Sequence, residues 1–353
     1  MQISTKIITF ALYFIKENMQ RIFKTLLLLT VLLSSSFLAA EVKQPISVRF
    51  DVRAEWDNHF RQDPDSMFYE SGFAGKYINF MLDGNINEHF AYHLRWRFNK
   101  MNSGADFFNA TDWAYLDYNI NKNWRISAGK QVVYIGGFEY DAAPIDVYYW
   151  STFWNNVNCY EFGVSGQYTT NDGRSTILAQ ISNSPFTSQS YRLDGLYAYN
   201  VIWYGSYGCF KSIWSTNMVE YAPGQYTNYL ALGNQFTAGP VTLQLDYMNR
   251  YYLHQQGGFF NDFTLIGKVD VNIKNRVNLF VKGGYDHNNT GNADAFVPDG
   301  TRYGFIGAGC EYYPIKDKKN LRLHAFWHTN NDNNFKDQYL TVGLKWLLTA
   351  FER

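Results

Sequence analysis

The segment FAYHLRWRFNK, residues 90–100, alternates two kinds of side chain along its whole length. Phe, Tyr, Leu, Trp and Phe occupy the even positions from 90 to 98, while Ala, His, Arg, Arg and Asn occupy the odd ones. In a helix this order would spread arginine and tryptophan around the whole circumference. In a strand, successive side chains point to opposite faces, so one face is apolar and the other is polar and basic. The segment therefore predicts a strand with two contrasting faces.

The same alternation recurs, in runs of about ten residues, from residue 46 to the C-terminus. Sixteen segments are expected to form strands, at 46–57, 73–83, 89–100, 110–120, 124–135, 159–169, 175–182, 195–207, 210–221, 226–237, 241–252, 262–272, 277–286, 302–313, 321–330 and 338–348. The alternation is less clean in the three segments between 195 and 237. No segment has a helical period over a useful length.

The connections between these segments also alternate in length. Those after even-numbered segments are short and rich in Gly and Asn, such as Gly84-Asn85 and Asn171-Asp172-Gly173. Most of those after odd-numbered segments are longer, and the longest is 136–158. Tight turns on one rim and long loops on the other are typical of an outer-membrane barrel.

Strand length separates this barrel from a soluble sandwich. Sandwich strands average nearer five or six residues. Ten residues at roughly 3.3 Å each, tilted by about 40°, rise about 25 Å, which is the height of a lipid-facing band. We therefore predict an all-β fold, a transmembrane antiparallel up-and-down β-barrel of about 16 strands, whose apolar face meets outer-membrane lipid and whose polar face meets water.

Composition agrees with this fold and excludes one class of partner. Phe, Tyr and Trp make up 19% of the chain, yet its mean hydropathy is −0.33, as expected when apolar side chains alternate with polar ones. The chain has 31 basic and 31 acidic residues. Residues 1–40 hold four of the basic residues and one acidic residue, which leaves 27 basic and 30 acidic residues in 41–353. This balance gives no reason to expect a nucleic-acid binder.

The N-terminus predicts an export signal. From Met19 the sequence reads MQRIFKTLLLLTVLLSSSFLAA, with basic residues, then an apolar run, then small residues. We expect residues 1–40 to be an N-terminal extension and signal peptide, with the start perhaps at Met19 and cleavage after Ala40. A single anchoring helix is the alternative, although the apolar run is short for one. Residues 41–353 are expected to form a single barrel.

A barrel of about sixteen strands is too wide for its own side chains to fill, so the expected lumen contains water. The connection 136–158 would narrow it if it folded inward as a third extracellular loop, because its many aromatic rings are unfavourable in open water. The residues expected in this constriction are Phe138, Glu139, Tyr140, Asp141, Asp146, Tyr148, Tyr149, Trp150 and Trp154. The alternative is that the loop caps the rim or packs against a neighbouring subunit.

Gly129-Lys130-Gln131, followed by GGFEYDAAPIDVYYW at 136–150, resembles the corresponding strand and loop of the phosphate-selective porin family, the porins O and P. The resemblance also extends to strand count and spacing over 41–353. It implies a trimeric sixteen-stranded channel in the bacterial outer membrane that passes small anions or general solutes. It also implies that inward lysines and arginines set anion selectivity. The third loop here carries three acids and no basic residue, so a general pore and an anion or phosphate channel both stay open.

Parity along the strands predicts which cations line the pore. They are Arg49, Arg53, Arg95, Arg97, Arg125, Lys268, Lys282, Arg322 and Lys345. Inward acids are expected as well, among them Asp51, Glu55 and Asp246. Charged groups on a pore wall set selectivity electrostatically. Alternatively, they pair with each other across strands and simply hydrate the wall. We predict at most a weak anion preference.

Enzymatic and metal chemistry find no support in the sequence. It contains neither a G-x-S-x-G elbow nor an H-E-x-x-H motif, and Ser165 falls inside an alternating strand. The three cysteines form no C-x-x-C pair. We predict no catalytic residue, no cofactor and no metal. The expected function is passive diffusion of small hydrophilic solutes or ions, with a plugged structural or ligand-binding barrel as the alternative from another class.

Overall fold

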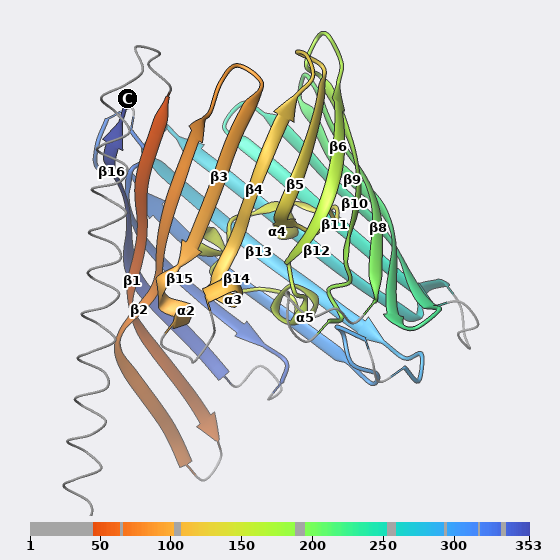
Figure 1. Cartoon of the computed structure of the whole chain (residues 1–353). Helices are drawn as coiled ribbons and strands as arrows, with labels where there is room; N and C mark the ends of the chain where they lie inside the picture. The colour runs from red at the N-terminus through yellow and green to blue at the C-terminus, as the bar shows by residue number, and fades with distance from the viewer. Residues whose placement is uncertain are drawn as a thin grey trace, which may run out of the picture. The chain divides into compact units, whose positions relative to one another are not determined.

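The computed structural model describes residues 45–63, 66–101, 107–187, 195–252, 259–292, 295–316, 318–332 and 337–353. The expected signal peptide, 1–40, lies outside these residues. Within them, sixteen antiparallel strands close into a barrel (Figure 1). Each strand pairs with its neighbours in sequence, and β1 closes the ring by pairing with β16. The predicted fold class is thereby confirmed.

The strand bounds follow the predicted ones closely from β3 onward. The strands are β1 (Ile46–Asp63), β2 (Ser66–Asn85), β3 (Phe90–Arg97), β4 (Thr111–Asn119), β5 (Trp124–Val132), β6 (Tyr160–Thr169), β7 (Ser175–Asn183), β8 (Tyr197–Tyr207), β9 (Phe210–Ala222), β10 (Gln225–Ala238), β11 (Val241–Tyr252), β12 (Asp262–Ile273), β13 (Val277–Asn288), β14 (Arg302–Tyr312), β15 (Leu321–Asn330) and β16 (Asp337–Glu352). The short helices are α2 (Phe98–Met101), α3 (Phe107–Ala110), α4 (Phe138–Asp141), η1 (Pro144–Asp146), α5 (Thr152–Asn156) and η2 (Phe259–Asn261). None of these described helices is long and apolar enough to cross a bilayer.

The first hairpin is longer than predicted. Residues 58–63 and 66–72 belong to β1 and β2, although the sequence placed them in a loop. His59 pairs with Asp337 of β16 at 2.8 Å, and its ring stacks on Tyr339 at 4.4 Å. Residues 58–63 read NHFRQD, with polar side chains at five of the six positions. Such a strand lacks the alternation on which the prediction relied. At the end of β3 the predicted strand is too long, because residues 98–100 form part of α2.

The two faces of the strands differ as the alternation predicted. In β7, Ile177 and Ile181 are about half exposed on the outside, whereas Gln180 between them is buried. Large apolar side chains are exposed on strands all around the barrel. A soluble protein rarely exposes so much contiguous apolar surface, and a lipid-facing wall does so on every strand. The polar residues consequently meet inside the barrel.

Candidate functional site: the third loop and the lumen wall

Two glycines let the chain turn from the end of β5 onto the inner wall. A Cβ on Gly136 would lie 2.7 Å from the carbonyl oxygen of Ile213, and Gly137 has a φ of 110°, which favours glycine. The inner wall also carries a glycine at the contact, since the Cα of Gly137 would lie 2.9 Å from a Cβ on Gly233. The third loop, residues 136–158, thus begins with its backbone against the backbone of β9 and β10.

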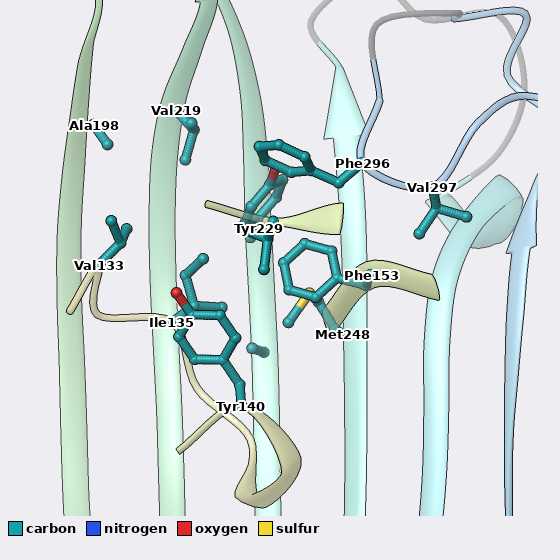
Figure 2. Packing of buried hydrophobic residues seen from close by; sticks show 12 residues of the cluster. Val133, Ile135, Tyr140, Phe153, Ala198, Val219, Tyr229, Met248, Phe296 and Val297 are labelled. Carbon is teal, nitrogen blue, oxygen red and sulfur yellow. The ribbon is translucent and has the colours of Figure 1, made fainter. Parts of the chain in front are cut away.

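Apolar side chains of the third loop bury against the inner wall of β8 to β11. Tyr140 and Phe153 pack in one cluster with residues of these strands, shown in Figure 2, and Phe153 is only 2% exposed. The wall residues in this cluster include Ala198, Val219, Tyr229, Ala231 and Met248. Facing the lumen, these side chains would otherwise meet water. Their burial under the loop stabilises it by roughly 25 cal/mol per Å² of apolar surface removed from water.

A wall carboxylate fixes the start of α4. Asp246 of β11 accepts hydrogen bonds from the backbone N–H groups of Phe138 and Glu139, at 2.9 and 2.8 Å. Glu139 in turn accepts from Nζ of Lys282 at 2.6 Å and from Oγ of Ser151 at the same distance. Lys282 also donates to the carbonyl oxygen of Tyr149 at 2.7 Å. The loop is therefore tied to β11 and β13 by charge-assisted hydrogen bonds.

The middle of the loop is held by two cations from β15 and β16. Oδ1 of Asp146 accepts from Nη1 of Arg322 and from Nζ of Lys345, each at 2.7 Å. Partial burial would raise the pKa of the Asp146 carboxyl, but the two cations outweigh it and hold this pKa below its usual range. Asp146 is consequently ionised at neutral pH. We call Asp146, Arg322 and Lys345 the Asp146 anchor.

Arg53 of β1 supports the backbone on either side of Asp146. Its Nη1 donates to the carbonyl oxygens of Ile145 and Val147, at 3.0 and 2.8 Å. The guanidinium carbon also lies 4.8 Å from the centre of the Tyr148 ring, a distance typical of a cation–π contact. Tyr148 donates its own hydroxyl proton to Glu311 at 2.6 Å. Arg53, which sequence parity had assigned to the open pore, therefore binds two carbonyl oxygens and an aromatic ring of the third loop.

These contacts place the third loop across the interior of the barrel. The loop follows β5, and in a closed ring of sixteen strands β13 is eight places from β5, on the opposite wall. Lys282 lies on β13 and binds the loop, as do residues of β15, β16 and β1. Figure 1 shows α4 within the ring of strands. Asp141 also reaches the wall, because its Oδ1 accepts from the Tyr204 hydroxyl of β8 at 3.1 Å.

Arg49 of β1 and the arginines of β3 and β5 bind acids of the wall instead of the loop, while Arg53 contacts Glu55 of its own strand at 2.6 Å in addition to the loop. Arg95 and Arg97 both contact Asp112, at 2.9 and 2.6 Å. Arg49 contacts Asp83 at 2.5 Å, and Arg125 contacts Asp117 at 3.2 Å. The Arg49 and Arg125 side chains keep 35% and 36% of their surface exposed, whereas Arg53 and Arg322 keep 3% and 7%. Arg49 and Arg125 therefore remain in contact with solvent, whereas Arg53 and Arg322 do not.

Three spaces lie against the third loop, and the largest and the smallest of them also border the inner faces of strands. The largest has a volume of about 450 Å³ and is lined by loop residues including Trp150 and Trp154, together with residues of the long connections after β3 and β7. The smallest, of about 80 Å³, is lined by Phe138 to Tyr149 of the loop and by inward residues of β11 to β14. The largest space lies toward the rim with the long connections. Loop and wall thus leave room on the side of β2 to β6.

Comparison with protein families agrees with this architecture. Residues 48–201 match the family described as phosphate-selective porin O and P, a stretch that includes β2 to β7 and the whole third loop. The match covers less than half of the chain, and this part of it resembles that family. This porin resembles solved barrels at low sequence identity. The anion-selective porin from Comamonas acidovorans is 11% identical, with a TM-score of 0.61, and the match covers 87% of this chain and all of that one. Outer-membrane expressed OmpT of Vibrio cholerae is 10% identical with a TM-score of 0.58, over 88% of this chain and 99% of that chain. No sequence among the curated proteins matches.

All nine cations predicted to line the pore have acidic partners in this porin. Lys268 pairs with Asp270 at 2.9 Å, and the others are those described above. Of the constriction residues, Glu139 and Asp146 bind wall cations, while Trp150 and Trp154 line the largest space. Their rings lie 5.4 Å apart. Whether these residues set permeation stays a prediction.

Sequence parity missed Asp112, the shared partner of Arg95 and Arg97. Arg95 pairs with Trp113 and Trp96 pairs with Thr111, so Asp112 is an extra residue of β4 between two paired positions. Such a bulge brings Asp112 to the same face as the odd-numbered inward residues. The sequence carries no local sign of it. Among the described residues, no group of three His, Cys, Asp or Glu side chains is placed to hold a metal ion.

Proposed function

We propose that this porin lets small hydrophilic solutes and ions diffuse passively across the bacterial outer membrane, through the lumen beside the third loop. The main support is that the loop is bound to the wall of β11 to β16 and to Arg53 of β1. The solvated charges of Arg49 and Arg125 are then left to line the remaining path. The loop then acts as a constriction rather than as a rim cap.

Selectivity in this proposal is weak, because each predicted cation has an acidic neighbour. Fields of paired charges cancel within a few ångströms in water, and salt at about 0.1 M screens them beyond about 10 Å. The passing ion therefore meets alternating small fields instead of a cationic ring. A phosphate-selective channel would need cations without such partners, and the geometry gives this alternative less support.

The family match over residues 48–201 supports a channel instead of an enzyme, and an outer-membrane location. Export through a signal peptide within 1–40 belongs to the same proposal. We further propose a homotrimer. One of the structures similar to this chain is described as the trimer form of in-vitro folded OmpT of Vibrio cholerae, at 11% identity and a TM-score of 0.57. The apolar outer face is compatible with either lipid or a second subunit.

Single-channel recording in planar bilayers tests the proposal. Purified, refolded protein should give stepwise current increases, and the reversal potential in a salt gradient should lie close to zero. A large reversal potential of the sign for anions would favour the anion-selective alternative. Protein that is folded by circular dichroism yet gives no current would favour a plugged barrel and overturn the proposal.

A further inference from the structure

The largest space beside the third loop is lined by an unusual mixture of side chains. We call it the outer vestibule, with a volume of about 450 Å³, within the range of about 300–1,000 Å³ that ligand sites occupy. Its lining includes two cations, two tryptophans and two asparagines, namely Arg97, Lys100, Trp150, Trp154, Asn155 and Asn158. They come from two segments of the chain, the end of β3 with α2 and the second half of the third loop. A site built from both segments exists only while the loop is docked.

The formal charge of the outer vestibule differs from that of the smallest space on the other side of the loop. Arg97, Lys100 and Lys130 line the vestibule, and Glu161 is the one acid among its lining residues, while Asp112 outside the lining binds Arg97. The smallest space has four acids and two lysines in its lining, namely Glu139, Asp146, Asp246, Glu311, Lys268 and Lys282. Water-filled spaces with low-dielectric walls focus such fields and raise the local concentration of the opposite charge. The vestibule therefore favours anions, and the inner space does not.

The aromatic rings of the vestibule give it a second kind of contact. Trp150 and Trp154 are both partly exposed, and their ring centres lie 5.4 Å apart with an interplanar angle of 32°. Partly exposed rings of this size offer a flat apolar surface at the border of a wet space. The C–H faces of a pyranose ring stack on such a surface, and open-chain polyols do so less well because they lack a flat face.

Amide groups supply the third kind of contact. Asn155 and Asn158 line the vestibule and are exposed, and they lie on either side of Asn156 in the same loop segment. Nδ2 of Asn158 donates to the carbonyl oxygens of Pro185 and Thr187, and Nδ2 of Asn155 donates to Oδ1 of Asn156, so these amides offer mainly their Oδ1 atoms as acceptors for sugar hydroxyls. An aromatic acid would use the rings and the cations but would leave these amides without ligand contacts.

From these three features we propose that the outer vestibule binds anionic monosaccharides, that is, a pyranose ring carrying a carboxylate or a phosphate. The ring stacks on Trp154 and Trp150, the anionic group lies toward Lys100 and Arg97, and the hydroxyls meet Asn155 and Asn158. The inference rests on the proposed function in one respect, namely that solutes reach the lumen. Binding itself requires only the docked loop.

Calorimetric titration of the refolded protein in detergent with glucuronate tests binding without any need for conduction. Glucuronate should bind about tenfold more tightly than glucose, which lacks the charge, and than gluconate, which lacks the ring. Trp154→Ala should weaken glucuronate binding about three- to tenfold, and Lys100→Gln should weaken it similarly while leaving the weaker glucose binding unchanged. Matched controls are Trp214→Ala on the outer face and Lys122→Gln in a turn on the opposite rim, both of which should retain wild-type affinity.

Several outcomes would overturn the inference. If gluconate binds as tightly as glucuronate, the site recognises the negative charge alone. If glucose binds as tightly as glucuronate, the cations have no role in binding. Tighter binding of benzoate than of glucuronate would assign the site to aromatic acids. Absence of glucuronate binding by folded wild-type protein would remove the site. Glucuronate binding by protein that gives no current in bilayers would leave the inference standing and overturn the proposed function instead.

Discussion

Replacing Asp146 by Asn tests how the third loop controls ion passage. Among the described residues of the loop, the Asp146 carboxylate is the group that both Arg322 and Lys345 contact, each at 2.7 Å. Asparagine keeps the size of the side chain and removes its charge. The variant therefore leaves two cations of the lumen wall partly uncompensated, although Glu311 and Asp51 remain near them at 3.4 and 3.1 Å.

The loss of anchoring is modest. Two unit charges at about 4 Å attract by about 4 kcal/mol at an effective dielectric constant of 20. The Asp146 side chain is 37% exposed, so solvent screening reduces each contact to about 1 kcal/mol, the upper end for exposed pairs. Phe153, Tyr140 and the Asp246 contacts still hold the loop. We therefore expect a docked loop and a folded barrel in Asp146→Asn, with a changed field.

The change in selectivity follows from that field. An ion passing about 6 Å from a unit charge in water has an interaction energy of about 0.7 kcal/mol, which 0.1 M salt screens to about 0.4 kcal/mol. Loss of the negative charge favours an anion and disfavours a cation by this amount. The anion-to-cation permeability ratio should then rise about fourfold at 0.1 M salt and by less than twofold at 1 M, where the Debye length is about 3 Å.

The assay is the reversal potential across a planar bilayer under a fixed salt gradient. Asn155→Gln is the matched control, because Asn155 is an exposed residue of the same loop and this replacement changes no charge. It should leave the permeability ratio close to the wild-type value. An equal shift in both variants, or none in Asp146→Asn, would refute the anchor as a determinant of the lumen field.

The pH dependence has a definite sign. Because the pKa of the Asp146 carboxyl is lowered in the folded protein, its stabilising contribution is fully present above the unfolded value of about 3.9 and is lost as pH falls through the lower folded pKa. The difference in permeability ratio between wild type and Asp146→Asn should therefore stay constant from pH 7 to pH 5. It should shrink only below about pH 4. A difference that disappears by pH 5 would contradict a lowered pKa.

Three further predictions concern the loop and the wall. Deletion of residues 140–154 should raise single-channel conductance, and an unchanged conductance would show that the third loop does not constrict the lumen. Gly136→Val should also raise conductance, because its Cβ would lie 2.7 Å from the Ile213 carbonyl oxygen. The clash costs about 1–3 kcal/mol, and the loop relieves it by leaving the wall. Gly166→Val is the control, since a Cβ there meets nothing within 4 Å. Val164→Lys places a charge on the 55% exposed outer face and should lower the stability of the barrel in lipid by about 2–4 kcal/mol if Val164 lies near the midplane, measured by urea unfolding in vesicles.

Strands were predictable from sequence wherever one face meets lipid and the other meets water. The prediction was weakest in β8 to β10, and the structure gives the reason. Ala198, Val219 and Tyr229 face inward there, yet they are buried against the third loop. With hydrocarbon outside and an apolar loop inside, both faces are apolar, and the period of two disappears. The blurred alternation was therefore itself a sign of where the loop docks.

The charges of the lumen were predictable one by one but not in pairs. Parity is a local property of a strand, and it placed Arg53, Lys282 and Arg322 on the inner face. Their partners in the loop are 92, 143 and 176 residues away in sequence. Pairing at such separation depends on closure of the barrel and on the path of the loop, neither of which a strand pattern contains.

The acids of the third loop show why counting charges misleads. Read from sequence, Glu139 and Asp146 argue against anion selectivity because they add negative charge to a constriction. In the structure each of them binds wall cations and fixes the loop in place. One carboxylate thus has two effects, since it cancels a local field and also sets the width of the path. A variant that removes the charge but keeps the size of the side chain separates the two effects. Asp146→Asn should therefore change selectivity more than conductance. Deletion of the loop should change conductance more than selectivity.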